Sequence, residues 1–241
     1  MKYTYRDCWH ICKYADRNFT YIEIPKAGCS TIKHQMSSYF KERLKKPPVP
    51  TTSELTKFMG YSRGRLPKDH DSFVFTVLRD PIARFISGIK MLTRIKHDFI
   101  PPAVVSAYET NHKNPSWFLP FLENGSFDYA MNETHMTPID FCIGNYIDSI
   151  EYACSIENLE ALEEKLNDTC GTEISFEHLF KSDTKDQPSL KENHLDILLN
   201  KYELSKSYEM TSFLSKLHFD VIDYNPLYWL QPMEQKKEFY A

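Results

Sequence analysis

The sequence predicts an α/β fold in which a parallel sheet is flanked by helices. Two strand-like runs, Phe19–Ile24 and Phe73–Leu78, are each followed closely by a helix-like run. Strands that alternate with helices favour parallel pairing, with helices covering both faces of the sheet. The chain of 241 residues is long enough for a substantial core, and we expect one domain over residues 1–241.

The first of these runs ends in a turn with several special residues. Phe19–Ile24 is β-branched and aromatic, as strands often are. Pro25 cannot donate to a sheet ladder and marks the end of the strand. Gly28 allows backbone conformations that other residues avoid, and Ser30 or Thr31 can cap a helix. Apolar residues then recur at helical spacing, which predicts a strand, a tight turn and a helix.

The second run has the same organisation. Phe73–Leu78 is almost continuously apolar, which is typical of a strand buried on both faces. Arg79 follows it at the carboxyl end, where ligands bind in open α/β sheets. Pro81 suits the first position of a helix, and Ser87 projects from a different side of that helix than its apolar face. The apolar face consists of Ile82, Phe85, Ile86, Ile89 and Leu92.

Both turns carry a cation, Lys26 in the first and Arg79 in the second. A helix N-terminus offers N–H groups and a partial positive charge, which together bind phosphate or sulfate. We therefore predict one anionic ligand held at two points. The chain lacks the G-x-x-x-x-G-K-[ST] spacing of an ordinary P-loop, so ATP or GTP is not the first choice.

The two turns resemble the donor site of a known enzyme family. P-K-A-G-C-S-T-I at residues 25–32 is similar to the 5′-phosphosulfate loop of sulfotransferases. R-D-P-I-A-R-F-I-S at residues 79–87 is similar to their 3′-phosphate motif, in which a Ser follows the Arg by eight positions. The resemblance implies a sulfotransferase fold with a P-loop-like parallel sheet. It also implies 3′-phosphoadenosine 5′-phosphosulfate (PAPS) as co-substrate.

Later blocks resemble the carbohydrate sulfotransferases that include the chondroitin 4-O and HNK-1 enzymes. Residues 132–138, followed by Cys142, are similar to their Asn-Glu-His-Trp-x-Pro block and the Cys after it. Here Thr134 is inserted and Met136 replaces the Trp. Three shorter blocks are also similar, the last with Asp223 in place of a Gly: residues 147–150, 157–159 and 219–224.

The resemblance implies roles for individual residues on the donor side. Lys26 would neutralise the charge that grows on the bridging oxygen. Arg79 and Ser87 would bind the 3′-phosphate. The 5′-phosphate would be held by the N–H groups of Ala27, Gly28, Cys29, Ser30 and Thr31.

The acceptor hydroxyl needs a proton acceptor near neutral pH, for which histidine is suited. We predict His135 as the general base with His70 in reserve, and a carboxylate such as Glu133 if neither acts. Sulfuryl transfer resembles phosphoryl transfer in depending on positioning and charge stabilisation. No step requires a metal, and the six cysteines lack the spacing of zinc ligands.

Two other functions stay open at this point. One is a nucleotide phosphotransferase with a degenerate P-loop, and the other is an inactive module that binds a glycan or a nucleotide.

The predicted reaction is in-line sulfuryl transfer to a carbohydrate hydroxyl. A glycan, a glycolipid and a non-sugar alcohol all remain compatible acceptors, and the sequence does not indicate an oligomeric state.

Charge is distributed unevenly along the chain. Residues 1–100 hold 19 Lys and Arg against 9 Asp and Glu, whereas the remaining residues hold 10 against 24. The positive part contains both predicted donor turns, and its field can concentrate anions near them. We expect an anionic nucleotide and a carbohydrate or glycolipid as ligands, and no nucleic acid.

No apolar run of 18 residues and no signal-peptide pattern occurs in the sequence. The expectation is a soluble, cytoplasmic, bacterial-type enzyme with possible peripheral membrane contact. A Golgi lumen location is expected only for a chain trimmed of its anchor.

Two further helical regions are predicted at residues 156–166 and 190–217. The proline-rich residues 97–131 are expected to form an insertion over the acceptor cleft.

Overall fold

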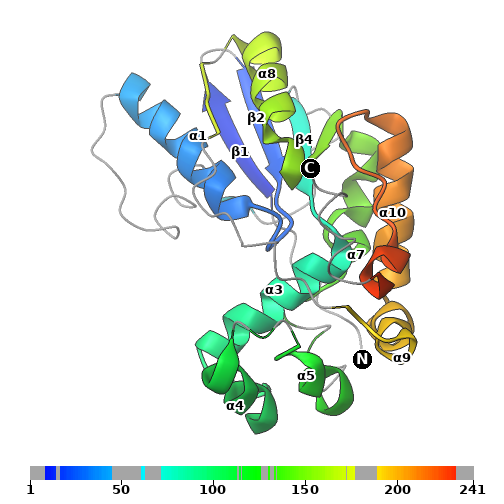
Figure 1. Cartoon of the computed structure of the whole chain (residues 1–241). Coiled ribbons are helices and arrows are strands. Elements are labelled where there is room, and N and C mark those ends of the chain that lie inside the picture. The colour runs from blue at the N-terminus through cyan, green and yellow to red at the C-terminus, as the bar shows by residue number, and fades with distance from the viewer. Residues whose placement is uncertain are drawn as a thin grey trace.

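A five-stranded sheet forms the centre of the computed structural model (Figure 1). The structure describes residues 9–14, 17–44, 61–62, 72–112, 114, 116–125, 130, 133, 135–171, 173–176 and 189–231. The strands lie in the order β3 (Tyr61–Ser62), β1 (Trp9–Tyr14), β2 (Arg17–Ile22), β4 (Ser72–Leu78) and β5 (Tyr152–Ser155).

Strands β2, β4 and β5 run parallel to one another, whereas β1 is antiparallel to both β2 and β3. The predicted α/β class with a parallel sheet and flanking helices is confirmed. The β1–β2 hairpin was not predicted, and it adds an antiparallel edge to the parallel strands.

Side chains alternate between the two faces of the sheet. Phe19 and Tyr21 of β2 face the same side as Phe75 and Val77 of β4, where they pack against two helices. These helices are α1 (Cys29–Leu44) and α8 (Leu159–Cys170). The alternation is the period of two that a strand imposes on its side chains.

The opposite face of the sheet carries Ile22, Val74 and Leu78. They pack against α7 (Ile139–Ile143), the 3₁₀ turn η1 (Gly144–Ser149) and α10 (Leu204–Leu217). Because both faces are covered, the apolar run of β4 is buried from both sides, as parallel strands usually are.

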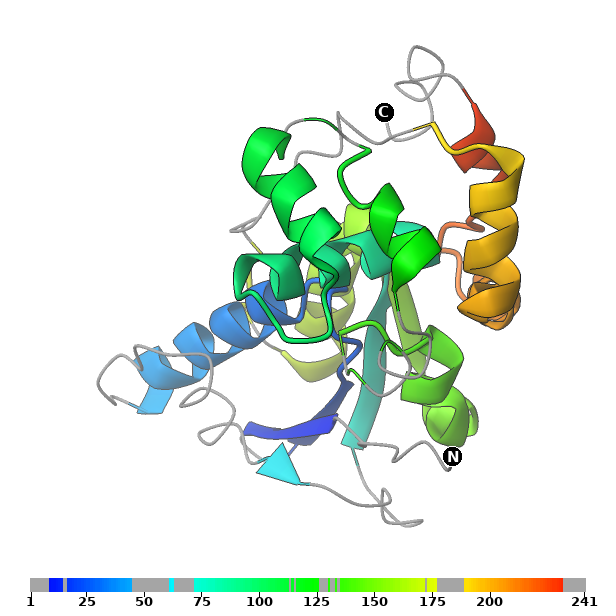
Figure 2. The ribbon, with the colours of Figure 1, turned by 90° about the horizontal axis from the view of Figure 1, so that it is seen from below.

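A layer of helices lies beyond the carboxyl ends of the parallel strands (Figures 1 and 2). It has its own core, to which Phe85, Phe121, Tyr202 and Trp229 contribute. The elements of this layer are α3 (Pro81–Arg94), α4 (Pro102–Asn111), α5 (Leu119–Asn124), α9 (Glu192–Asp196), the π-helical turn η4 (Ile197–Lys201) and the 3₁₀ turn η5 (Pro226–Leu230).

The boundaries of the predicted elements shift by a few residues. β2 ends at Ile22 because the last two residues of the predicted strand already lead into the turn. The helix predicted from residue 156 begins as the 3₁₀ turn η2 (Ile156–Asn158) before α8. Residues 97–131 include α4 and α5, and their place over an acceptor cleft stays a prediction. Among the described residues, no helix has the length and apolarity needed to cross a membrane.

Candidate functional site

The turn between β2 and α1 has an unusual backbone. Lys26 adopts a φ of 69° and Gly28 a φ of 79°, both in the left-handed region. For a lysine this conformation costs about 1–3 kcal/mol and persists only where surrounding contacts hold it. Gly28 also has a steric role, because a Cβ there would lie 2.9 Å from Cδ1 of Ile156. The turn therefore has a fixed shape set by its neighbours.

The helix after this turn begins earlier than the sequence suggests. The carbonyl of Gly28 accepts the bond from the N–H of Ile32 at 3.1 Å, and α1 starts at Cys29. Ser30 and Thr31 therefore lie inside the first turn, and the expectation that one of them caps the helix is wrong. The physical reason is that the left-handed Gly28 turns the chain directly into the helix.

The first amides of a helix lack partners within the helix and can face an anion. Cys29, Ser30 and Thr31 are the first three residues of α1, and the role of their N–H groups in holding a 5′-phosphate stays a prediction. The N–H of Ala27 instead donates to the carbonyl of Ile24 at 3.1 Å, which closes the turn. Burial raises the pKa of the Cys29 thiol to about 11, so the thiol stays protonated near neutral pH.

The second turn, between β4 and α3, is anchored by a buried carboxylate. Oδ1 of Asp80 accepts from the N–H of Ala83 at 2.8 Å and caps α3, and Pro81 occupies the first helical position as predicted. Asp80 also accepts from the hydroxyl of Tyr208 at 2.9 Å and from Nε1 of Trp229 at 3.1 Å. Burial raises the pKa of Asp80 to about 6, against the opposing effect of its three donors. The carboxylate ties α10 and η5 to this turn.

The two turns contact each other through arginines. Nη1 of Arg79 donates to the carbonyl of Lys26 at 3.2 Å. Nε of Arg84, a fully buried residue of α3, donates to the carbonyl of Pro25 at 2.7 Å. The structure therefore brings together the two turns that were predicted to share one ligand.

Lys26 is surrounded by other cations, which affect its pKa. Burial lowers its pKa, and the charges of Arg79, Arg94 and Arg84 lower it further, whereas Cys29 acts in the opposite direction. Arg94 is exposed at the end of α3 and was not among the predicted residues. A site of this kind gains by binding an anion, because the anion offsets the repulsion among the cations.

The predicted base, His135, is paired with a carboxylate. Its Nδ1 lies 2.5 Å from Oε1 of Glu133, and its side chain is 37 % exposed. The hydrogen bond from His135 lowers the pKa of Glu133, so the carboxylate stays ionised. A carboxylate that accepts from Nδ1 orients the ring and leaves Nε2 as the nitrogen that can take a proton.

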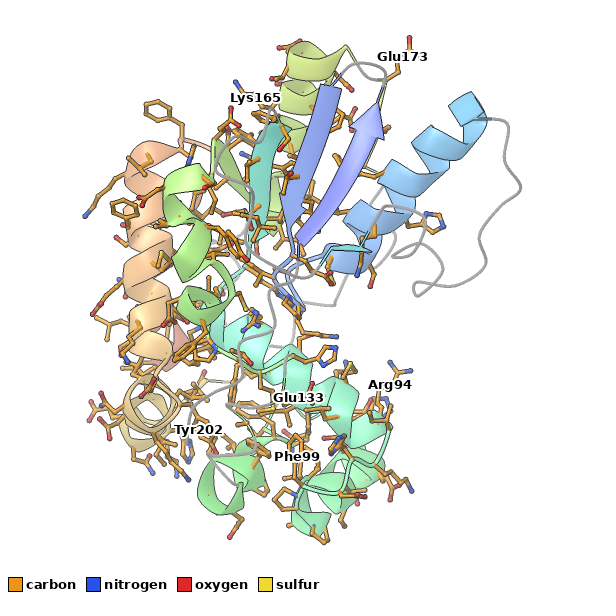
Figure 3. All side chains as sticks on the ribbon, turned by 180° about the vertical axis from the view of Figure 1, so that it is seen from behind. Arg94, Phe99, Glu133, Lys165, Glu173 and Tyr202 are labelled. Carbon is orange, nitrogen blue, oxygen red and sulfur yellow. The ribbon has the colours of Figure 1, made fainter. Side chains whose placement is uncertain are left out.

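The His135 segment lies directly against α3. A Cβ at Gly88 would lie 2.6 Å from the carbonyl oxygen of His135. Ser87, the residue predicted to bind a 3′-phosphate, immediately precedes Gly88 and is half-buried. Figure 3 shows Glu133 beside α3 and Arg94 at the end of that helix, both in the layer beyond the strands. One helix thus supports both the predicted donor side and the predicted acceptor side.

The end of β5 is closed by the C-terminal blocks that the sequence singled out. Nδ2 of Asn158 donates to Oδ1 of Asp220 at 3.4 Å, and the hydroxyl of Tyr224 donates to Oε2 of Glu157 at 2.6 Å. These contacts join residues more than 60 positions apart. The separate blocks therefore meet at one end of the sheet.

Some residues of the site were missed or cannot be placed. His70 lies outside the described residues, so its reserve role stays a prediction. Lys33 was not singled out, yet it is 6 % exposed and pairs with Glu23 at 2.8 Å, which ties the first part of α1 to the strand end. The described part of the chain contains no group of three or more His, Cys, Asp or Glu that is placed to hold a metal ion.

The fold and the site together define an α/β protein with two cationic turns at the ends of adjacent parallel strands. The chain matches the model of the sulfotransferase family over residues 9–217. This match covers most of the chain, and the protein belongs to the sulfotransferase family. Comparisons with curated proteins and with solved structures gave no significant match.

Proposed function

We propose that this protein transfers a sulfuryl group from PAPS to a hydroxyl of a carbohydrate acceptor, free or in a glycolipid. The observation that supports this most is the contact between Arg79 and the carbonyl of Lys26. It joins the two turns whose motifs resemble the 5′-phosphosulfate and 3′-phosphate sites. Members of the family generally use PAPS, which carries phosphate at both of these positions.

On the donor side, the start of α1 would hold the 5′-phosphate through the N–H groups of Gly28 to Thr31. Arg79 and Ser87 would bind the 3′-phosphate, which distinguishes PAPS from adenylyl sulfate. Lys26 would stabilise the bridging oxygen as it becomes negative. Its pKa is lowered by burial and by nearby cations, and a dianionic phosphate beside it would raise that pKa again and so favour the charged form.

On the acceptor side, the hydroxyl oxygen attacks sulfur in line with the departing phosphate. The new O–S bond forms as the bond from sulfur to the bridging oxygen breaks. The hydroxyl proton passes to Nε2 of His135, and 3′-phosphoadenosine 5′-phosphate leaves. Glu133 holds the ring through Nδ1 and stabilises the imidazolium that forms.

The acceptor class follows from the resemblance to the chondroitin 4-O and HNK-1 group. The contacts that join Glu157 to Tyr224 and Asn158 to Asp220 support that part of the proposal, because they bring the group's later blocks together. The identity of the sugar and the hydroxyl that is sulfated are left to the experiment.

The test is sulfate transfer from labelled PAPS to a library of neutral and acidic glycans, glycolipids and simple alcohols. A parallel reaction contains labelled ATP in place of PAPS. We expect sulfated glycan with PAPS and no labelled product with ATP. Phosphate transfer from ATP would favour a phosphotransferase instead. Binding of nucleotide without any transfer would favour an inactive binding module.

A further inference from the structure

Arg84 is a fully buried cation without a carboxylate partner among the described residues. It lies one turn into α3 with 0 % of its surface exposed. Burial lowers its pKa, although the ordinary value for a guanidinium is so high that it stays charged. Burying a charge costs free energy unless hydrogen bonds compensate it. The hydrogen-bond partners of Arg84 therefore indicate which segments of the fold this side chain holds together.

The partners come from the first turn and from the stretch of chain that leads into and includes α7. Nε donates to the carbonyl of Pro25 at 2.7 Å, Nη1 donates to the carbonyl of Thr137 at 2.5 Å, and Nη2 lies 3.8 Å from Sγ of Cys142. Pro25 precedes the strained Lys26, and Thr137 follows the His135 segment. One side chain thus connects the turn of the candidate donor lysine to the segment of the candidate base.

The bond to Pro25 also bears on the backbone of Lys26. The carbonyls of Pro25 and Lys26 are consecutive, and each accepts from a different arginine, Arg84 and Arg79. Contacts of this kind are what a left-handed lysine needs in order to persist. Loss of the Arg84 bond would therefore release the turn that sets the position of the lysine side chain.

We infer that Arg84 is a positioning residue that fixes the spacing between Lys26 and His135. The inference rests on the proposed sulfuryl transfer. Arginine is suited to this task because its planar fork carries five donors and can satisfy acceptors in several directions at once. Lysine carries a single nitrogen and cannot bond Pro25 and Thr137 in the same geometry.

The charge of Arg84 gives a second, independent readout. Arg84 is one of the three cations that lower the pKa of Lys26. Its removal raises the pKa of Lys26, so the loss of activity at high pH that follows deprotonation of this lysine moves to higher pH. An uncharged residue that only fills space, such as Leu198, would not move that limb of the profile.

The experiment compares Arg84→Met, which removes the charge and the donors, with Arg84→Lys, which keeps the charge. For each we would measure kcat with PAPS, the Kd of 3′-phosphoadenosine 5′-phosphate, the melting temperature and the high-pH limb of activity. Leu198→Ala is the control, because it empties a buried position in the helical layer away from both turns. It shows how much turnover is lost through destabilisation alone.

We expect Arg84→Met to lower kcat about a hundredfold while the nucleotide Kd changes far less, because misplaced groups slow reactions by such factors. Its high-pH limb should move upward. Arg84→Lys should fold, lose about tenfold in kcat and keep the wild-type limb. If Arg84→Met does not fold, the kcat and the high-pH limb of Arg84→Lys test the positioning role instead.

Two outcomes would overturn the inference alone. One is wild-type turnover in either variant. The other is a loss of kcat no larger than that of Leu198→Ala when the melting temperatures of the two variants fall by a similar amount. If the wild-type chain itself transfers no sulfate from PAPS, the proposed function fails first and the inference falls with it. The wild-type assay therefore separates the two failures.

Discussion

The proposed donor side and the proposed acceptor side of the site are built in different ways. On the donor side the chain presents backbone: the turn from Pro25 to Gly28 is held by the half-buried Arg79 and the buried Arg84 and leads into the first amides of α1. On the acceptor side it presents a side-chain pair, Glu133 and His135, which are 21 % and 37 % exposed. The first arrangement suits a fixed anion, and the second suits a proton transfer at the edge of solvent.

This difference predicts two kinds of failure. Changes on the donor side remove charge that the transition state requires. Changes on the acceptor side remove a proton acceptor or shift it.

Lys26→Ala should have the largest effect on turnover. We expect a loss of about 10²–10³ in kcat, the range seen when one group that stabilises developing charge is removed. Donor affinity should change much less, because the lysine acts most strongly once the bridging oxygen becomes negative. Steady-state kinetics with PAPS would measure both effects. Lys90→Ala, an exposed lysine on α3, is the matched control. A higher KM with unchanged kcat would show that Lys26 only binds the donor.

His135→Ala should lower kcat by about a hundredfold at saturating donor, as expected for loss of a general base. Glu133→Gln should cost less, since it keeps the ring but loses the charge that stabilises imidazolium. His70→Ala tests the reserve residue, and His112→Ala, exposed after α4, is the control. The measurement is kcat across pH, with nucleotide binding checked separately. Near-full activity in both His135→Ala and His70→Ala would transfer the role to a carboxylate such as Glu133.

Gly88→Ala should disturb the acceptor side and spare the donor side. The new Cβ would lie 2.6 Å from the carbonyl of His135 and must push that segment away. We expect a loss of about 1–3 kcal/mol in the free energy of unfolding, as for other overpacked positions. We also expect a kcat lower by about tenfold with unchanged nucleotide affinity. Gly144→Ala is the control, because a Cβ there meets nothing within 4 Å. Equal kinetics for the two variants would show that the contact at Gly88 does not position the His135 segment.

Asp80 gives a smaller, pH-dependent effect on stability. Its pKa in the folded protein is about 6, above the ordinary 3.8, so the folded state binds the proton more tightly than the unfolded state. The contribution of Asp80 is therefore present at low pH and is lost as pH rises toward and through 6.

Asp80→Asn should remove this dependence. The free energy of unfolding of the variant, relative to wild type, should rise between about pH 4 and pH 6 by roughly 2–3 kcal/mol and stay level above that range. Denaturant unfolding at several pH values would measure it, and Tyr208→Phe provides a control that keeps the carboxylate. A difference between variant and wild type that does not change with pH would contradict the assigned ionisation.

The two strand–turn–helix units of the proposed donor side could be predicted from the sequence because their parts are local. A strand, Gly28, a cation and a helix start lie within one short segment, and the second turn repeats the pattern. The role of Arg84 could not be predicted, although the residue was visible in the motif. Its partners Pro25 and Thr137 lie 59 and 53 positions away, so its contacts exist only in the folded chain.

The acceptor side shows the same limit. The sequence placed His135 and Glu133 close together, but a separation of two residues does not determine whether the side chains meet. The packing of this segment on Gly88 depends on how α3 and the loop approach each other, which no local pattern encodes. The β1–β2 hairpin was not predicted, because the alternation of strands with helices indicates parallel strands and says nothing of an antiparallel edge.

The central claim is that the two joined turns hold a nucleotide with phosphates at both its 3′ and 5′ positions. Calorimetric titration of the protein with 3′-phosphoadenosine 5′-phosphate and with AMP tests it directly. A charge-assisted contact contributes about 1.5–3 kcal/mol, so we expect a preference of more than tenfold for the 3′-phosphorylated nucleotide. Arg79→Ala should abolish that preference. Equal affinity of the wild-type protein for the two nucleotides would contradict the claim.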